Sequence, residues 1–208
     1  MKKMILTTAM AVSSALGLAS CAQDKQAKRR AAAADGDRKV LVAYFSRTGE
    51  NYAVGNITTG NTEIVAGMIA AETGATLFRI DPATAYPDDY DECTEVARRE
   101  KESGARPAIK GDIAAEDYDI VFIGYPNWWG DAPMPVYTFI EKHRWQGKTV
   151  IPFCTHEGSG LGQTARNIGR ACAGATMPGG LAVRGATAQR DREAARRSVS
   201  EWLGGLEI

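Results

Sequence analysis

Short apolar runs alternate with stretches of helical period from residue 39 to the end of the chain. The apolar runs cover residues 40–45, 75–80, 120–125, 149–153 and 181–183. The first four are uninterrupted, which is typical of strands buried on both faces of a parallel sheet. A loop rich in glycine or hydroxyl residues follows each run and leads into the next helical stretch. The pattern predicts repeated βα units and five parallel strands.

The helical stretches show apolar residues at the spacing of one helix face. These faces are Ile64, Val65, Met68 and Ile69; Val136, Phe139 and Ile140; Leu161, Ala165, Ile168 and Cys172; and Val199, Trp202, Leu203 and Leu206. A weaker helix is marked by Tyr90, Cys93 and Ala97. Neither an internal repeat nor a second domain is visible, so the sequence predicts one open, doubly wound α/β domain over residues 38–208.

The beginning of the chain resembles an export signal. Lys2 and Lys3 precede an apolar run that ends at Leu18, and the small residues before Cys21 resemble the lipobox of bacterial lipoproteins. Residues 1–20 are therefore a predicted signal peptide, and Cys21 the predicted lipidation site. A plain cleaved signal is the alternative. Either way, we expect the protein outside the cytoplasm, and a lipid would hold it on the periplasmic or cell-surface side of a membrane.

Residues 22–37 are polar and rich in alanine, without apolar periodicity. Such a composition buries too little apolar surface to fold, so residues 21–37 are predicted to be the lipidated cysteine and a flexible tether.

Composition and charge narrow the class of protein further. Apolar residues make up 44% of the chain, and 25 basic residues balance 25 acidic ones, so nothing in the charge favours a nucleic acid as partner. The spacing of the four cysteines forms no zinc motif. Cys93, Cys154 and Cys172 fall on separate elements, with Cys93 on a helix at the far side of the sheet, so we expect all three to be free.

Candidate chemistry lies after the first strand, because ligands of such sheets bind at the carboxyl ends of the strands. Here the loop contains Ser46, Thr48 and Gly49, and Asn61 and Thr62 begin the following helix. Hydroxyl groups and free amides at a helix start can hold a phosphate. A serine/threonine turn with a helix cap is the alternative.

The loops after the third and fourth strands are also unusual. The first of them contains Pro126, Asn127, Trp128, Trp129 and Gly130, and the second contains Thr155, His156, Glu157, Gly158, Ser159 and Gly160. Two adjacent tryptophans in a loop are hard to place in a core, so we expect a flat aromatic ligand to cover them. Replacing both tryptophans is therefore expected to leave the fold intact. The glycines let the backbone approach that ligand closely.

These strings make the chain similar to the flavodoxin family, over residues 39–207. The strings are YFSRTG (44–49), YPNWWG (125–130) and THEGSGLG (155–162). The resemblance implies a flavodoxin-like three-layer sandwich with strand order 2-1-3-4-5 and noncovalently bound FMN. It also implies that Ser46, Thr48, Asn61 and Thr62 hold the phosphate, and that residues 126–130 and 155–160 flank the isoalloxazine. Residues 50–60 interrupt the usual phosphate motif, which leaves open which hydroxyls contact phosphate.

Two functions follow from this reading. The first is an electron carrier that docks with a protein donor and a protein acceptor; the alternative is an FMN-dependent NAD(P)H:quinone-type oxidoreductase. A serine hydrolase centred on Ser159 is a poor alternative because Glu157 replaces the first glycine of its motif. His156 either points toward the flavin, or caps a helix or faces water. His143 is expected to be a solvated residue at a helix end.

Overall fold

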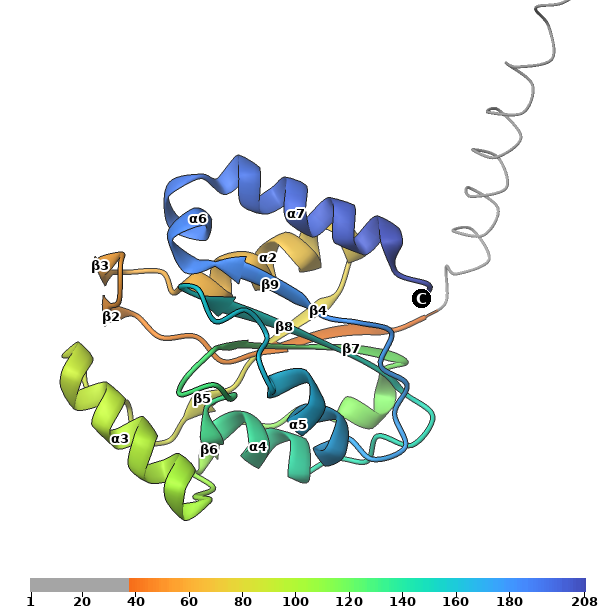
Figure 1. Cartoon of the computed structure of the whole chain (residues 1–208). Coiled ribbons are helices and arrows are strands. Elements are labelled where there is room, and N and C mark those ends of the chain that lie inside the picture. Colours follow the sequence, from red (N-terminus) through yellow and green to blue (C-terminus); the bar gives the residue numbers. More distant parts are fainter. Residues whose placement is uncertain (1–37) are drawn as a thin grey trace, which may run out of the picture. The chain divides into compact units, whose positions relative to one another are not determined.

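Five parallel strands form the central sheet, in the order β4-β1-β7-β8-β9 (Figure 1). The computed structural model describes residues 38–208, and the predicted signal peptide, Cys21 and tether lie outside the described residues. Along the chain the strands are β1 (Val40–Tyr44), β4 (Thr76–Arg79), β7 (Ile120–Pro126), β8 (Thr149–His156) and β9 (Leu181–Arg184). Numbered by their position along the chain, they lie in the order 2-1-3-4-5, which confirms the predicted fold.

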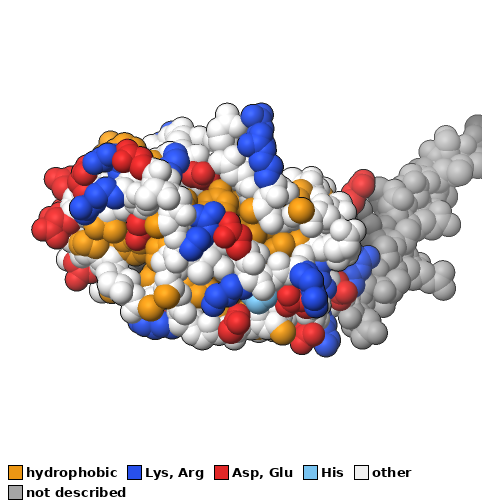
Figure 2. Space-filling view, turned by 90° about the horizontal axis from the view of Figure 1, so that it is seen from below, with side chains coloured by type: hydrophobic (Ala, Val, Ile, Leu, Met, Phe, Trp, Pro, Cys, Tyr) orange, Lys and Arg blue, Asp and Glu red, His pale blue; other side chains and the backbone are white. Residues whose placement is uncertain are grey.

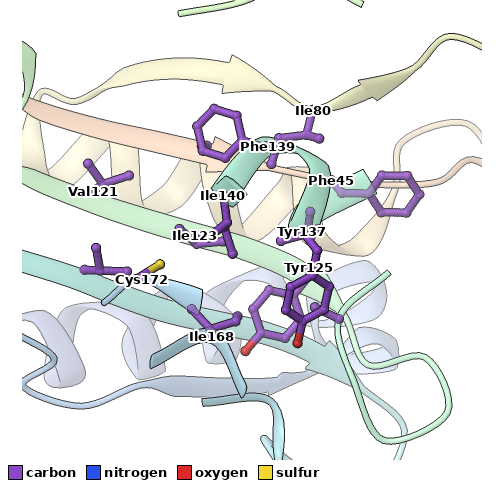
Figure 3. Close-up of a cluster of buried hydrophobic side chains, with 14 of the residues drawn as sticks. Phe45, Ile80, Val121, Ile123, Tyr125, Tyr137, Phe139, Ile140, Ile168 and Cys172 are labelled. Atoms are coloured by element: carbon purple, nitrogen blue, oxygen red, sulfur yellow. The ribbon is translucent and has the colours of Figure 1, made fainter. Parts of the chain in front are cut away.

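Helices cover both faces of the sheet and make three layers. One layer contains α2 (Asn61–Thr73), α6 (Gly185–Arg190) and α7 (Arg192–Gly205), and the other contains α3 (Tyr90–Ser103), α4 (Met134–Glu141) and α5 (Thr164–Ala171) (Figure 1). Successive strand residues point to opposite faces, so β1 supplies both cores. Leu41 and Ala43 join the core beneath α4 and α5, which Figure 3 shows, while Val42 and Tyr44 join the core beneath α2 and α7.

Three details differ from the sequence prediction. The run at 75–80 is not buried on both faces, because β4 is an edge strand and Leu77 is 48% exposed. Helix α5 starts three residues after Leu161, since Gly160 and Gly162 adopt left-handed conformations that break the helical period. Helix α6 was not predicted; its six residues are too few to show a period.

Two small antiparallel pairs lie outside the main sheet. Strands β2 (Gly49–Asn51) and β3 (Gly55–Ile57) form a hairpin within the stretch that interrupts the phosphate motif. Strands β5 (Asp81–Pro82) and β6 (Ile109–Lys110) pair on either side of α3, and a 3-10 turn, η1 (Ala115–Asp117), precedes β7. The hairpin projects at the carboxyl edge of the sheet, near the beginning of α3 (Figure 1).

The remaining predictions concern single residues. Cys93, Cys154 and Cys172 are buried and free, as expected, although α3 carries Cys93 in the same layer as α5 and not on the far side. His143 was expected to be solvated, and this is wrong: its side chain is 5% exposed and its Nδ1 lies 3.2 Å from a carboxylate oxygen of Glu116.

Within residues 38–208, no helix has the length and apolar character needed to cross a membrane.

Candidate functional site

A cavity of about 140 Å³ lies where the carboxyl ends of β7 and β8 meet the start of α2. Seven residues predicted from the sequence line it: Asn61, Pro126, Asn127, Trp128, Thr155, His156 and Glu157. They come from three separate parts of the chain, and the parallel sheet brings them together at one edge.

The start of α2 is held against the loop after β1 by very close packing. A Cβ atom on Gly60, the N-cap of α2, would lie 2.1 Å from Ser46 Oγ and 2.6 Å from the Arg47 carbonyl oxygen. Glu63 N–H donates to Ser46 Oγ at 3.0 Å. Ser46 is therefore an acceptor for the first turn of α2, and its hydroxyl lies beside the remaining free amides of that turn.

Two hydroxyl residues join α2 to β8. The Oγ1 atoms of Thr62 and Thr155 are hydrogen bonded at 2.8 Å, and both residues are buried. This bond fixes the predicted phosphate end of the site relative to the loop after β8.

Asn61 provides a test of whether a polar ligand fits the cavity. Its Oδ1 is buried and has no hydrogen-bond partner among the described residues. Its side-chain amide packs closely on the backbone of Gly185, where an added Cβ would lie 2.2 Å from Asn61 Nδ2. A buried acceptor without a partner is costly, and a hydroxyl group on a bound molecule would satisfy it. With the amides of α2 beside it, this end fits a ligand that carries hydroxyls and a phosphate.

The two tryptophans differ in their surroundings. The Trp128 ring packs edge-on against Phe45 and Tyr86, at centroid distances of 5.3 and 5.1 Å, and still lines the cavity. Trp128 is therefore partly buried against the core, whereas the sequence prediction placed both tryptophans outside it. Trp129 is 52% exposed and lies outside this cavity, and its indole N–H donates to the Thr94 carbonyl at 3.0 Å.

The loop after β8 is ordered by its own side chains. Gly158 N–H donates to His156 Nδ1 at 2.8 Å, and Ala186 N–H donates to Glu157 Oε1 at 2.7 Å. Burial lowers the pKa of His156, Arg184 lowers it further, and Glu157 opposes them more weakly. His156 is therefore neutral at pH 7, as its acceptor role requires.

The other predicted residues border the site without lining it. Thr48, Gly130, Gly158, Ser159 and Gly160 lie in the same loops, and Gly49 begins β2. The Gly160 carbonyl accepts from Asn127 Nδ2 at 2.8 Å, which joins the loop after β7 to the loop after β8. The carbonyls of Thr48 and Gly49 accept from Asn51 Nδ2 at 3.4 and 3.1 Å. These contacts make Thr48, Gly49 and Gly160 supports for the cavity wall.

Sequence reasoning missed three lining residues. Asn51 and Tyr52 belong to the hairpin, and Tyr90 begins α3. The rings of Tyr52 and Tyr90 lie 6.0 Å apart and close one side of the cavity. The interruption of the phosphate motif was the signal that could have found the hairpin residues, because it lies between two parts of the predicted site.

Arg47 attaches the hairpin to the segment before α3. Its Nη2 donates to the carbonyls of Pro87 and Asp88, each at 2.6 Å, and its Nε donates to Pro87 at 3.1 Å. Its Nη1 donates to the Glu50 carbonyl. The guanidinium therefore ties the hairpin to the segment before α3.

This arrangement defines a class: a doubly wound α/β protein with a site for a phosphate-bearing aromatic cofactor at the carboxyl edge of the sheet. The family model described as flavodoxin matches residues 39–202, and the chain belongs to the flavodoxin family.

Solved structures agree with this assignment. A candidate flavoprotein from Bacteroides eggerthii is 32% identical with a TM-score of 0.64, and the match covers 83% of this chain and 99% of that one. A second, from Bacteroides uniformis, is 30% identical with a TM-score of 0.63 and coverages of 80% and 98%. A flavoprotein from Lactobacillus acidophilus, solved in complex with FMN, shares the fold at 21% identity, with a TM-score of 0.56 and coverages of 70% and 93%. No match was found among curated proteins.

Proposed function

We propose that this chain is an FMN-binding electron carrier, held outside the cytoplasm by a lipid on Cys21. FMN is the cofactor of the family to which the chain belongs, and when bound it supplies one- and two-electron transfer. The observation that carries the proposal is the meeting of the α2 start, the Trp128 loop and the His156 loop around one cavity.

The residues at the two ends of the cavity have different tasks. At the α2 end, the free amides and Ser46 would hold the phosphate, and Asn61 would accept a hydrogen bond from a ribityl hydroxyl. At the other end, Trp128 lines the cavity and would pack against the isoalloxazine and exclude water from it. His156 brings no positive charge to this end at neutral pH, because its pKa is lowered.

Local charge supports docking with protein partners. Although the chain has no net charge, Asp91 and Glu92 lie in the first turn of α3, beside the cavity. Figure 2 shows acidic side chains at this end of the molecule, with Lys and Arg side chains among them. Long-range attraction would favour a partner with a basic surface.

Binding is tested by titrating the Lys39–Ile208 unit with FMN and with riboflavin. We expect one FMN per chain and about tenfold or greater weakening without the phosphate, which corresponds to roughly 1.4 kcal/mol or more. Equal affinities would contradict the phosphate assignment. An anaerobic redox titration of the loaded protein, followed by addition of NAD(P)H, then separates a carrier from an enzyme.

Anchoring is tested in bacterial cells that express the full chain. We expect the wild type to take up a labelled fatty acid and to fractionate with membranes, whereas Cys21→Ser does neither. Fatty-acid labelling of Cys21→Ser would contradict the lipidation site.

The alternative, reduction of a quinone or similar small molecule with NAD(P)H, requires a second ligand site beside the cofactor. One observation favours it: a second cavity shares a wall with the first.

A further inference from the structure

A second cavity, of about 220 Å³, lies between α3 and the loop after β7. Asn51, Tyr90, Asn127 and Trp128 line both this cavity and the one proposed for FMN, so the two spaces are adjacent. Arg47 also lines the second cavity, and among the described residues of this lining it carries the charged side chain. A positive charge therefore lies beside the end of the cofactor site that Trp128 borders.

The backbone and the side chain of Arg47 belong to different ends of the site. Its backbone packs against the start of α2, where a Cβ on Gly60 would lie 2.6 Å from the Arg47 carbonyl oxygen. Its side chain extends away from this end, because Nη2 donates to the carbonyls of Pro87 and Asp88 just before α3. The charge is thus placed toward the expected position of the isoalloxazine and not at the predicted phosphate end.

No opposite charge pairs with the guanidinium. Its hydrogen-bond partners are the carbonyl oxygens of Glu50, Pro87, Asp88 and Asp89, and a carbonyl group has no net charge. Within residues 38–208, no carboxylate forms an ion pair with Arg47. The residue is half-buried, so salt and water screen its charge less than that of a fully exposed side chain.

Two side chains of α3 show that this charge acts within the cavity. Burial raises the pKa of Cys93 and of Tyr90, and Arg47 opposes the increase at both, because a positive charge favours the thiolate and the phenolate. Both side chains line the second cavity, and Tyr90 also lines the first. A negative charge that develops between these walls would be stabilised in the same way.

Uptake of two electrons and one proton gives a flavin ring a negative charge, so a cation beside the ring favours the reduced form. His156 is neutral at pH 7, because its pKa is lowered, and does not supply this cation. We propose that Arg47 is a redox-tuning residue whose positive charge stabilises reduced FMN and raises its reduction potential. The inference rests on the proposed function in placing FMN in the first cavity.

The test compares the two redox forms of FMN bound to the Lys39–Ile208 unit. Anaerobic titration gives the reduction potential of bound FMN, and its difference from that of free FMN gives the ratio of the affinities for the reduced and oxidised forms. Arg47→Met removes the charge and should lower this ratio at least tenfold. Such a change lowers the potential by about 30 mV or more for a two-electron couple.

A second variant separates the charge from the hydrogen bonds. Arg47→Lys keeps the charge but cannot reproduce the bonds of the guanidinium to the carbonyls of Pro87 and Asp88. It should keep the affinity ratio within about threefold of the wild type, even where the apo-protein loses stability. Equal changes of the ratio in Arg47→Lys and Arg47→Met would assign the effect to the position of the hairpin and overturn the inference. Arg47→Gln supplies another uncharged side chain if Arg47→Met does not fold.

Arg196→Met is the matched control. It removes the same charge from an exposed position of α7, which covers the opposite face of the sheet from α3 (Figure 1). We expect the potential of this variant to equal that of the wild type. A shift as large as that of Arg47→Met would mean that the net charge of the domain is responsible, and would also overturn the inference.

Riboflavin distinguishes a role of Arg47 toward the phosphate. If Arg47→Met weakens both redox forms of FMN equally and leaves riboflavin affinity unchanged, the charge acts on the phosphate and the inference is wrong. FMN binding with an unchanged potential in Arg47→Met overturns the inference alone. Absence of FMN binding to the wild type overturns the proposed function and, with it, any role of Arg47 toward FMN.

Discussion

At the scale of the residue, neighbours in one loop perform different tasks. Trp128 packs against Phe45 and Tyr86, whereas Trp129 remains half exposed and contacts α3 through its indole N–H. The difference arises because successive side chains diverge, so only one of the two rings can enter the core.

Single replacements of the two tryptophans should therefore have different effects. Trp128→Ala should lower the free energy of unfolding by about 3 kcal/mol, the low end for loss of a large aromatic, because the ring is only partly buried. It should also weaken FMN binding. Trp129→Ala should cost less than about 1 kcal/mol, as usual for an exposed side chain. Denaturant unfolding of the apo-protein measures both, and equal losses would contradict this division.

His156 should make stability depend on pH. Its pKa is lowered in the folded protein, so below its ordinary value of 6.5 the unfolded chain takes up a proton that the folded chain resists. The contribution of neutral His156 to the free energy of unfolding is complete above pH 6.5 and is lost as the pH falls below this value. Protonation also removes the acceptor for Gly158 N–H.

Thermal unfolding at a series of pH values tests this expectation. His156→Asn keeps an acceptor without a titrating group, and it leaves His143 unchanged. The variant should lose less stability than the wild type between pH 7.5 and 5.5. Identical pH profiles would exclude His156 as the source.

At the scale of the element, the start of α2 depends on one close approach. Gly60 has a φ of −68°, which any residue can adopt, but a Cβ would clash with Ser46 Oγ and the Arg47 carbonyl. The glycine is thus required by contact between two segments and not by its own conformation.

Two glycine-to-alanine substitutions distinguish the steric clash at the start of α2 from the effect of alanine on helix stability. Gly60→Ala should destabilise the apo-protein by about 1–3 kcal/mol, as overpacking usually does, and should weaken FMN binding more than riboflavin binding. Gly67→Ala, within α2 and with open space around its Cβ, should stabilise it by about 0.5–1 kcal/mol. Chemical denaturation and FMN titration of both variants check this, and a stable Gly60→Ala with normal FMN affinity would contradict it.

At the scale of the whole molecule, the sheet separates two cores. Cys154 and Cys172 lie in the core beneath α4 and α5, and burial raises the pKa of each thiol to about 12. Neither thiol is reactive while the fold is intact, because the thiolate is the reactive form.

Thiol counting should reflect this burial. For the Lys39–Ile208 unit, we expect slow reaction in the folded state and three thiols after denaturation without reductant. The folded-state rate should rise with denaturant in step with unfolding. A count of one thiol would reveal a disulfide and contradict the present positions of the cysteines.

The five strands and the three loops at their carboxyl ends could be predicted from the sequence, because uninterrupted apolar runs and glycine-rich turns are local signals. The sequence did not determine how the tryptophans divide between core and surface, that Tyr52 and Tyr90 meet beside the cavity, or that His143 is buried. It also missed the second cavity beside Trp129. These features depend on contacts between segments far apart in the chain, such as the bonds from Arg47 to Pro87 and Asp88. The pattern of apolar and polar residues predicts which side of an element is buried. The packing of elements that are distant in the sequence decides which residues that side contacts.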